Sequence, residues 1–214
     1  MDEDIAIINV KTRNEKIKNF LVANKKPLIL TLLLIIFLVI GFYSYQIYKD
    51  DHKEWLSDKY NSAVIEFNND DKIKVISVMK EIINDKDSTY SPLALYFLID
   101  NNLISNKSEI NELFDILIEK TTLENEIKNL IIYKKGLYNA DFVSENELLN
   151  ILKPITNSKS VWKSHALYLL AEYFYSKNEI EKSKDFFNQL LLTENANQDL
   201  VKNTKKRLNR DLSE

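Results

Sequence analysis

The chain has 214 residues, a formal net charge of −3, no cysteine, two glycines and three prolines. So few helix-breaking residues predict an almost wholly helical protein. The lack of cysteine excludes disulfides, cysteine ligands for zinc and thiol catalysis. Residues 50–214 carry 22 basic against 28 acidic residues, and we expect no basic stripe in them, which argues against nucleic acid as the partner.

The first predicted element is an apolar helix within residues 25–51, KKPLILTLLLIIFLVIGFYSYQIYKDD. The 22 residues between Lys26 and Lys49 carry no charge. At about 1.5 Å per residue they span roughly 33 Å, enough for a hydrocarbon core of about 30 Å. A cleaved signal peptide would have a shorter apolar region and small residues at its end, and a buried core helix would have a polar stripe. The pattern therefore predicts a retained transmembrane helix over residues 27–48.

The flanks of this helix predict its orientation. Residues 1–26 hold six Lys and Arg residues, whereas the three lysines that follow the helix are interspersed with four acidic residues. The positive-inside rule then keeps residues 1–26 in the cytoplasm and sends residues 49–214 across the membrane. The N-terminal segment is a basic retention flank or, alternatively, a short amphipathic cytosolic helix with Ile5, Ile8, Ile17, Phe20 and Leu21. The aromatic residues typical of an interfacial belt are Phe42, Tyr43, Tyr45 and Tyr48.

Beyond the membrane, apolar residues at steps of three and four predict only helices. Two of them form a membrane-proximal pair within residues 49–87, and the others make up a domain over residues 88–214. The turn at residues 68–71 should also supply an N-cap to the second helix. The predicted helices are 51–67, 71–84, 90–103, 108–121, 124–138, 144–152, 160–176, 179–193 and 197–211.

Internal repeats predict the architecture of residues 88–214. The segment Ala94–Leu98 recurs 72 residues later as Ala166–Leu170, and the apolar segment Leu130–Lys134 lies halfway. This spacing predicts three degenerate pairs of antiparallel helices, with residues 197–211 as a polar capping helix. The expected fold class is all-α, with a single transmembrane helix followed by a tetratricopeptide-like α-solenoid of antiparallel helix pairs.

The last predicted pair resembles a tetratricopeptide repeat, whose period is about 34 residues. It departs from that motif at Ser183 and Leu190, where the motif has Ala, and at Asn195, where the motif has Pro. Larger side chains at close contacts should alter the packing angle of neighbouring helices. The residues that match its Leu-Gly, Tyr, turn Gly and second-helix aromatic positions are Leu170, Ala171, Phe174, Asn178 and Phe187.

The layout as a whole resembles a bacterial family. A charged N-terminus precedes one transmembrane helix that ends in GFYSYQIYKD, and the segments STYSPLALYFL and VWKSHALYLLAEYFYSKNEIEKSKDFFNQLL follow it. These features resemble the YfgM-type family of ancillary subunits of the SecYEG translocon, closest to its α-proteobacterial branch. The resemblance implies a single-pass inner-membrane protein with a periplasmic domain. It also implies partners in the Sec translocon and a membrane-anchored periplasmic chaperone of the prolyl-isomerase type.

No segment of the sequence matches a catalytic or cofactor motif. It contains no Gly-rich phosphate loop, no Gly-x-Ser-x-Gly elbow and no His-Glu-x-x-His pair. We expect His52 in solvent just outside the membrane, and His165 has no second His nearby to complete a metal site. We therefore expect no enzyme, no cofactor, no metal and no small-molecule substrate.

A protein-binding groove is the candidate site. In tetratricopeptide arrays the second, fifth, ninth and twelfth residues of each first helix line the inner groove, and aromatic residues there take extended polypeptide. The alternative is that these side chains pack against neighbouring helices. The candidate groove residues are Tyr96, Asp100, Ile132, His165, Tyr168, Glu172 and Tyr175, with Leu93, Leu103, Asn129, Gly136 and Asn139 in the same rows.

These features together predict a non-enzymatic scaffold that binds proteins beside the membrane. Tethering raises local concentration, so that weak contacts suffice, and the resemblance implies that the scaffold assists newly exported proteins at the translocon. The alternative is a structural adaptor in envelope assembly or cell division. An enzyme is the third hypothesis, which a metal or nucleotide in the purified protein would favour.

Overall fold

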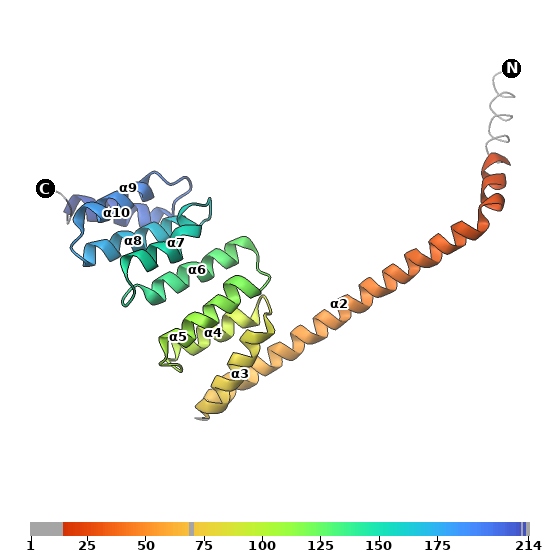
Figure 1. The fold of residues 1–214 in the computed structure, drawn as a ribbon, viewed down its shortest axis with the longest axis horizontal. Coiled ribbons are helices and arrows are strands. Elements are labelled where there is room, and N and C mark those ends of the chain that lie inside the picture. The colour runs from red at the N-terminus through yellow and green to blue at the C-terminus, as the bar shows by residue number, and fades with distance from the viewer. Residues whose placement is uncertain (1–14, 69–70, 211, 213–214) are drawn as a thin grey trace, which may run out of the picture. The chain divides into compact units, whose positions relative to one another are not determined.

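The structure, a computed structural model, describes residues 15–68, 71–210 and 212. Every regular element within these residues is a helix, which confirms the predicted all-α class (Figure 1). Most of the predicted N-terminal amphipathic segment lies outside the described residues. Its described part is helical over residues 15–23.

The chain forms two compact units, Met1–Trp55 and Leu56–Glu214. Helix α2 (Lys25–Asn68) supplies the apolar stretch of the first unit, and every residue from 25 to 51 is exposed; Phe37, for example, is 76% exposed. Apolar side chains without a protein partner are stable only in non-aqueous surroundings. Among the described residues, α2 is the helix long and apolar enough to span a membrane, as the sequence predicts.

Short helices follow the end of α2 in the unit Leu56–Glu214. Their ends lie within three residues of the predicted ones, with two exceptions. The predicted helix 108–121 is divided into α5 and η1, and α7 runs to Thr156, past the predicted end at residue 152. Pro154 explains the second exception, because a proline usually ends a helix but here lies inside its last turn. The helices are α3 (Lys72–Asp85), α4 (Tyr90–Asp100), α5 (Lys107–Asp115), the π-helical turn η1 (Ile116–Lys120), α6 (Asn125–Asn139), α7 (Glu145–Thr156), α8 (Lys163–Ser176), α9 (Ile180–Leu191) and α10 (Gln198–Arg210).

Side chains at the helix ends explain these boundaries. The Asp71 carboxylate accepts a 3.3 Å hydrogen bond from the Lys74 N–H, which confirms the N-cap predicted for the second helix. Ser144 and Glu147 form a capping box at the start of α7. Asn178, at the turn-glycine position between α8 and α9, has a left-handed φ of 61°, a conformation that Asn tolerates better than most residues.

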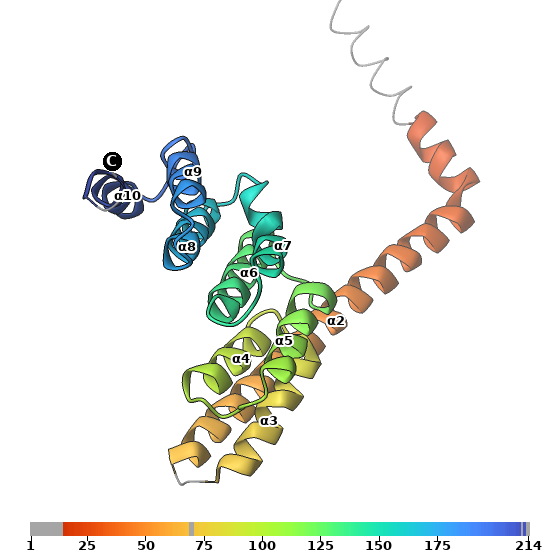
Figure 2. The same ribbon diagram turned by 60° about the vertical axis from the view of Figure 1, so that its left-hand side comes forward.

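The short helices pack in pairs (Figure 2). Helix α8 packs against α9 and α6 against α7, as the repeats predict. Helix α4, however, packs more extensively against α3 than against α5. The first predicted pair is therefore corrected from α4–α5 to α3–α4.

One hydrophobic core explains the α3–α4 pairing, because the end of α2 and helices α3, α4 and α5 all contribute to it. Ser91 of α4 donates a buried 2.6 Å hydrogen bond to the Ile82 carbonyl of α3. The predicted division between residues 49–87 and 88–214 runs through this core. A second core joins α6, α7 and α8. The buried residues of the first core are Leu56, Ala63, Val75, Met79, Ile82, Ile83, Ala94, Leu95, Leu98, Ile110, Leu113, Phe114, Leu117 and Ile131.

Candidate protein-binding surface

Helix α8 carries four of the candidate groove residues, and α10 contacts those in its later turns. Arg207 of α10 donates two hydrogen bonds to the Glu172 carboxylate, from Nε at 2.8 Å and from Nη2 at 2.7 Å. The Arg207 guanidinium also lies 4.2 Å from the centroid of the Tyr175 ring. Tyr168 packs edge-on against Phe187 of α9, with the ring centroids 5.6 Å apart. Tyr168, Glu172 and Tyr175 are thus contacted by side chains of the same domain.

His165 lies in an aromatic cluster at the start of α8. Its ring centroid is 5.0 Å from that of Trp162 and 5.8 Å from that of Tyr133. The Nδ1 atom is buried with no hydrogen-bond partner among the described residues. Burial lowers the pKa of His165, so the imidazole is neutral near pH 7.

The candidate row on α6 faces the interior of the domain. Ile132 is only 6% exposed and belongs to the core between α6, α7 and α8. Gly136 adjoins α7 so closely that a β-carbon there would lie 2.5 Å from Cδ2 of Leu152. Asn139 and Asn111 of α5 exchange two amide hydrogen bonds of 2.8 and 2.9 Å. This row therefore packs against neighbouring helices, which is the alternative that the sequence left open.

The candidate row on α4 is the most open of the three. Leu93 is 41% exposed and Asp100 is exposed, while Tyr96 lies between them, half-buried. The Lys134 ammonium of α6 lies 4.3 Å from the centroid of the Tyr96 ring, a cation–π contact. Burial raises the pKa of Tyr96 to about 12, so its hydroxyl is a hydrogen-bond donor at neutral pH.

The sequence patterns did not predict that Lys134 and Arg207 contact candidate groove residues. Arg207 follows Glu172 by 35 residues, and Lys134 follows Tyr96 by 38. Both spacings lie within two residues of the predicted period of 36, because Lys134 belongs to the first helix of the next repeat, α6, and Arg207 to the capping helix α10. A search for charges within two residues of one period after each candidate residue would have included them.

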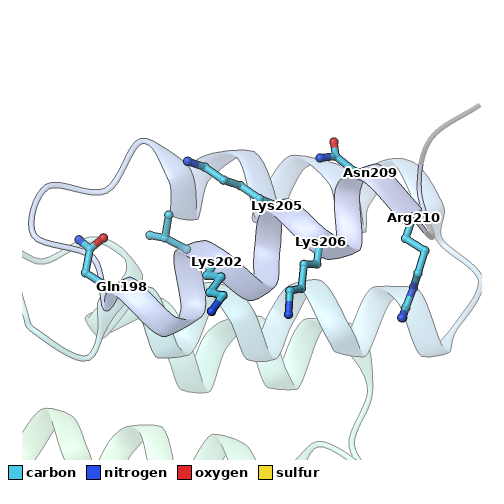
Figure 3. Close-up of a pocket in the computed structure, with 7 residues that line it drawn as sticks. Gln198, Lys202, Lys205, Lys206, Asn209 and Arg210 are labelled. Atoms are coloured by element: carbon cyan, nitrogen blue, oxygen red, sulfur yellow. The ribbon is translucent and has the colours of Figure 1, made fainter.

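A second feature missed in the sequence is a basic face on α10. Its side chains lie along the helix in Figure 3 and line a shallow depression. The expectation that residues 50–214 carry no basic stripe is wrong for this helix. The signal was present in the run Lys205-Lys206-Arg207, which the acidic composition of the domain obscured. The basic lining residues are Lys202, Lys205, Lys206 and Arg210.

The fold defines an all-α protein with a helix long and apolar enough to span a membrane. In its helical domain the candidate row on α4 is open, and the candidate row on α8 is covered by side chains of α10. Among the described residues, no group of three or more His, Cys, Asp or Glu side chains could hold a metal ion. No protein-family model, no curated protein and no solved structure matches the chain. Membership of the YfgM-type family therefore stays a prediction.

Proposed function

We propose that this protein is a non-enzymatic adaptor that is anchored in the bacterial inner membrane and binds other proteins through its helical domain. The row on α4 carries the proposal. It presents an apolar side chain, Leu93, an aromatic one, Tyr96, and a carboxylate, Asp100, on one helix. Aromatic and apolar residues are typical of the centre of protein interfaces, and charged residues such as Asp of the polar rim.

The apolar part of α2 supports the membrane anchor. A domain held at a membrane meets membrane-bound partners at high effective concentration, so a small row of side chains suffices for function. The six basic residues of the N-terminal flank support a cytoplasmic N-terminus and a periplasmic domain. From the resemblance to the YfgM-type family, we take the partners to be the Sec translocon and a membrane-anchored chaperone, and the clients to be newly exported proteins.

Site-specific photocrosslinking in living cells tests this proposal. A photoreactive amino acid in place of Tyr96 or Asp100 should crosslink to other proteins, which mass spectrometry then identifies. Lys153 on α7 is exposed and lies outside the candidate rows, so it serves as the matched control.

Translocon or chaperone subunits crosslinked from α4, and not from residue 153, would support the proposal. No crosslinked protein from α4, or equal yields from α4 and from residue 153, would overturn it. Envelope-assembly or division proteins in the crosslinked set, with a septal distribution of the protein in cells, would favour the structural adaptor instead.

A further inference from the structure

The basic face of α10 is a second surface whose chemistry indicates a ligand. In Figure 3 the side chains of Lys202, Lys206 and Arg210 project from the same side of the helix, as their spacing of four residues requires. They border a shallow depression of about 900 Å³ along the helix. The other lining residues are Gln198, Val201, Lys205 and Asn209.

The charge of α10 is opposite to that of the domain around it. Helix α10 carries five basic residues and a single acidic one, Asp199, whereas residues 50–214 are acidic as a whole. Arg207 is directed to Glu172 of α8. Lys202, Lys205 and Lys206 form no ion pair with any residue that the structure describes. Three ammonium groups on one helix are therefore available to an external anion.

The shape and composition of this face fit a layer of lipid headgroups better than a protein. A protein interface needs an apolar core, and the only apolar residue that lines the depression is the half-buried Val201. Clustered lysines bind an anionic lipid surface by charge alone, without a matching shape. Nucleic acid fits less well, because three or four cations on an acidic domain release few counterions.

The chain itself carries a segment suited to lipid, because α2 is long and apolar enough to span a membrane. We propose that α10 docks on the headgroups of anionic phospholipids through Lys202, Lys205 and Lys206. This docking does not depend on the protein partner proposed for α4. Each lysine near an anionic surface contributes about a fivefold gain in the docked population.

Energy transfer between α10 and the lipid surface tests the docking. The chain has no cysteine, so Asn203→Cys on the exposed side of α10 provides a unique labelling position. The labelled full-length protein is reconstituted in nanodiscs of phosphatidylcholine alone, or with about one third phosphatidylglycerol, and an acceptor is placed on the headgroups. Transfer should rise several-fold with phosphatidylglycerol and fall again at about 0.5 M salt.

Two variants of equal net charge distinguish this face from the charge of the whole domain. K202E/K205E/K206E should lose the dependence on phosphatidylglycerol. K120E/K153E/K159E, which changes three exposed lysines on other elements, should keep it. K202Q/K205Q/K206Q should also lose the dependence, without the added negative charge, and circular dichroism checks that each variant remains helical.

Three outcomes would overturn the docking. The first is equal transfer in neutral and anionic nanodiscs for the unaltered face. The second is an equal loss in the two charge-reversed variants. The third concerns hydrogen exchange of the α10 amides: polyglutamate would slow it in neutral nanodiscs, and phosphatidylglycerol would not. That result would assign the face to an acidic protein.

Discussion

Arg207 of α10 and Glu172 of α8 form a two-point salt bridge with donor–acceptor distances of 2.8 and 2.7 Å, across 35 residues of sequence. Thr204 is the one described residue of α10 that is fully buried. Leu200, Val201 and Leu208 of α10 are only partly buried where they pack against the domain, so this ion pair adds a specific contact between α10 and α8. The same pair explains why the predicted groove on α8 is covered.

Arg207→Ala should loosen α10 and lower the free energy of unfolding by about 1–2 kcal/mol. The substitution removes a bidentate, charge-assisted hydrogen bond and leaves the partly buried Glu172 unpaired. Denaturant unfolding measures the change in stability, and hydrogen exchange should show faster exchange of the α10 amides. Glu181→Gln is the control, because it breaks an exposed ion pair with Lys184 and should change stability by less than about 0.5 kcal/mol. Unchanged exchange in α10 of Arg207→Ala would contradict the prediction.

Gly136→Ala should destabilise the domain by about 1 kcal/mol or more, although Ala favours helix by about 1 kcal/mol. The new β-carbon would meet Cδ2 of Leu152 at 2.5 Å, and Leu152 is fully buried. Thermal and denaturant unfolding measure the loss. Leu152→Ala relieves the overlap, so the double variant should lose less stability than the two single losses added together. Additive losses would show that the two residues do not compete for space.

Asn139→Ala should cost about 2 kcal/mol, because it leaves the amide of Asn111 without its partner between α5 and α6. Once that partner is gone, Asn111→Ala should add little, and a double-mutant cycle of denaturant midpoints measures the coupling. Asn188→Ala on the exposed side of α9 is the matched control and should stay within about 0.5 kcal/mol. The absence of coupling between residues 111 and 139 would argue against the paired amides.

Stability should fall as the pH decreases below about 6.5, in part because of His165. Burial lowers its pKa in the folded protein, so the unfolded chain binds more protons in this range. The contribution is present above the ordinary histidine pKa and is lost as the pH falls through the lowered value. His165→Leu should therefore flatten the fall in unfolding free energy below about pH 6.5. An unchanged slope in this variant would show that carboxylates alone produce the acid sensitivity.

The residues of the candidate groove show what a local sequence pattern predicts and what it does not. The motif register placed Tyr96, Ile132 and Tyr168 on equivalent positions of successive first helices. In the structure, however, Tyr96 is half-buried, Ile132 is buried and Tyr168 is covered by another helix. Register along a helix predicts which side chains share a face. It does not predict what lies against that face, because this depends on residues about one repeat away.

Local sequence alone determined where most helices begin and which segment is apolar enough for a membrane, because periodicity, caps and the lack of charge act over a few residues. Asp71 and Ser144 illustrate this, since their side chains cap the first turns of α3 and α7. Only the tertiary structure decided that α4 pairs with α3 and that Arg207 covers the candidate row on α8. It also decided that Lys202, Lys205 and Lys206 of α10 are exposed to solvent. Each of these depends on competition between apolar faces, and on long side chains that cross from one helix to another.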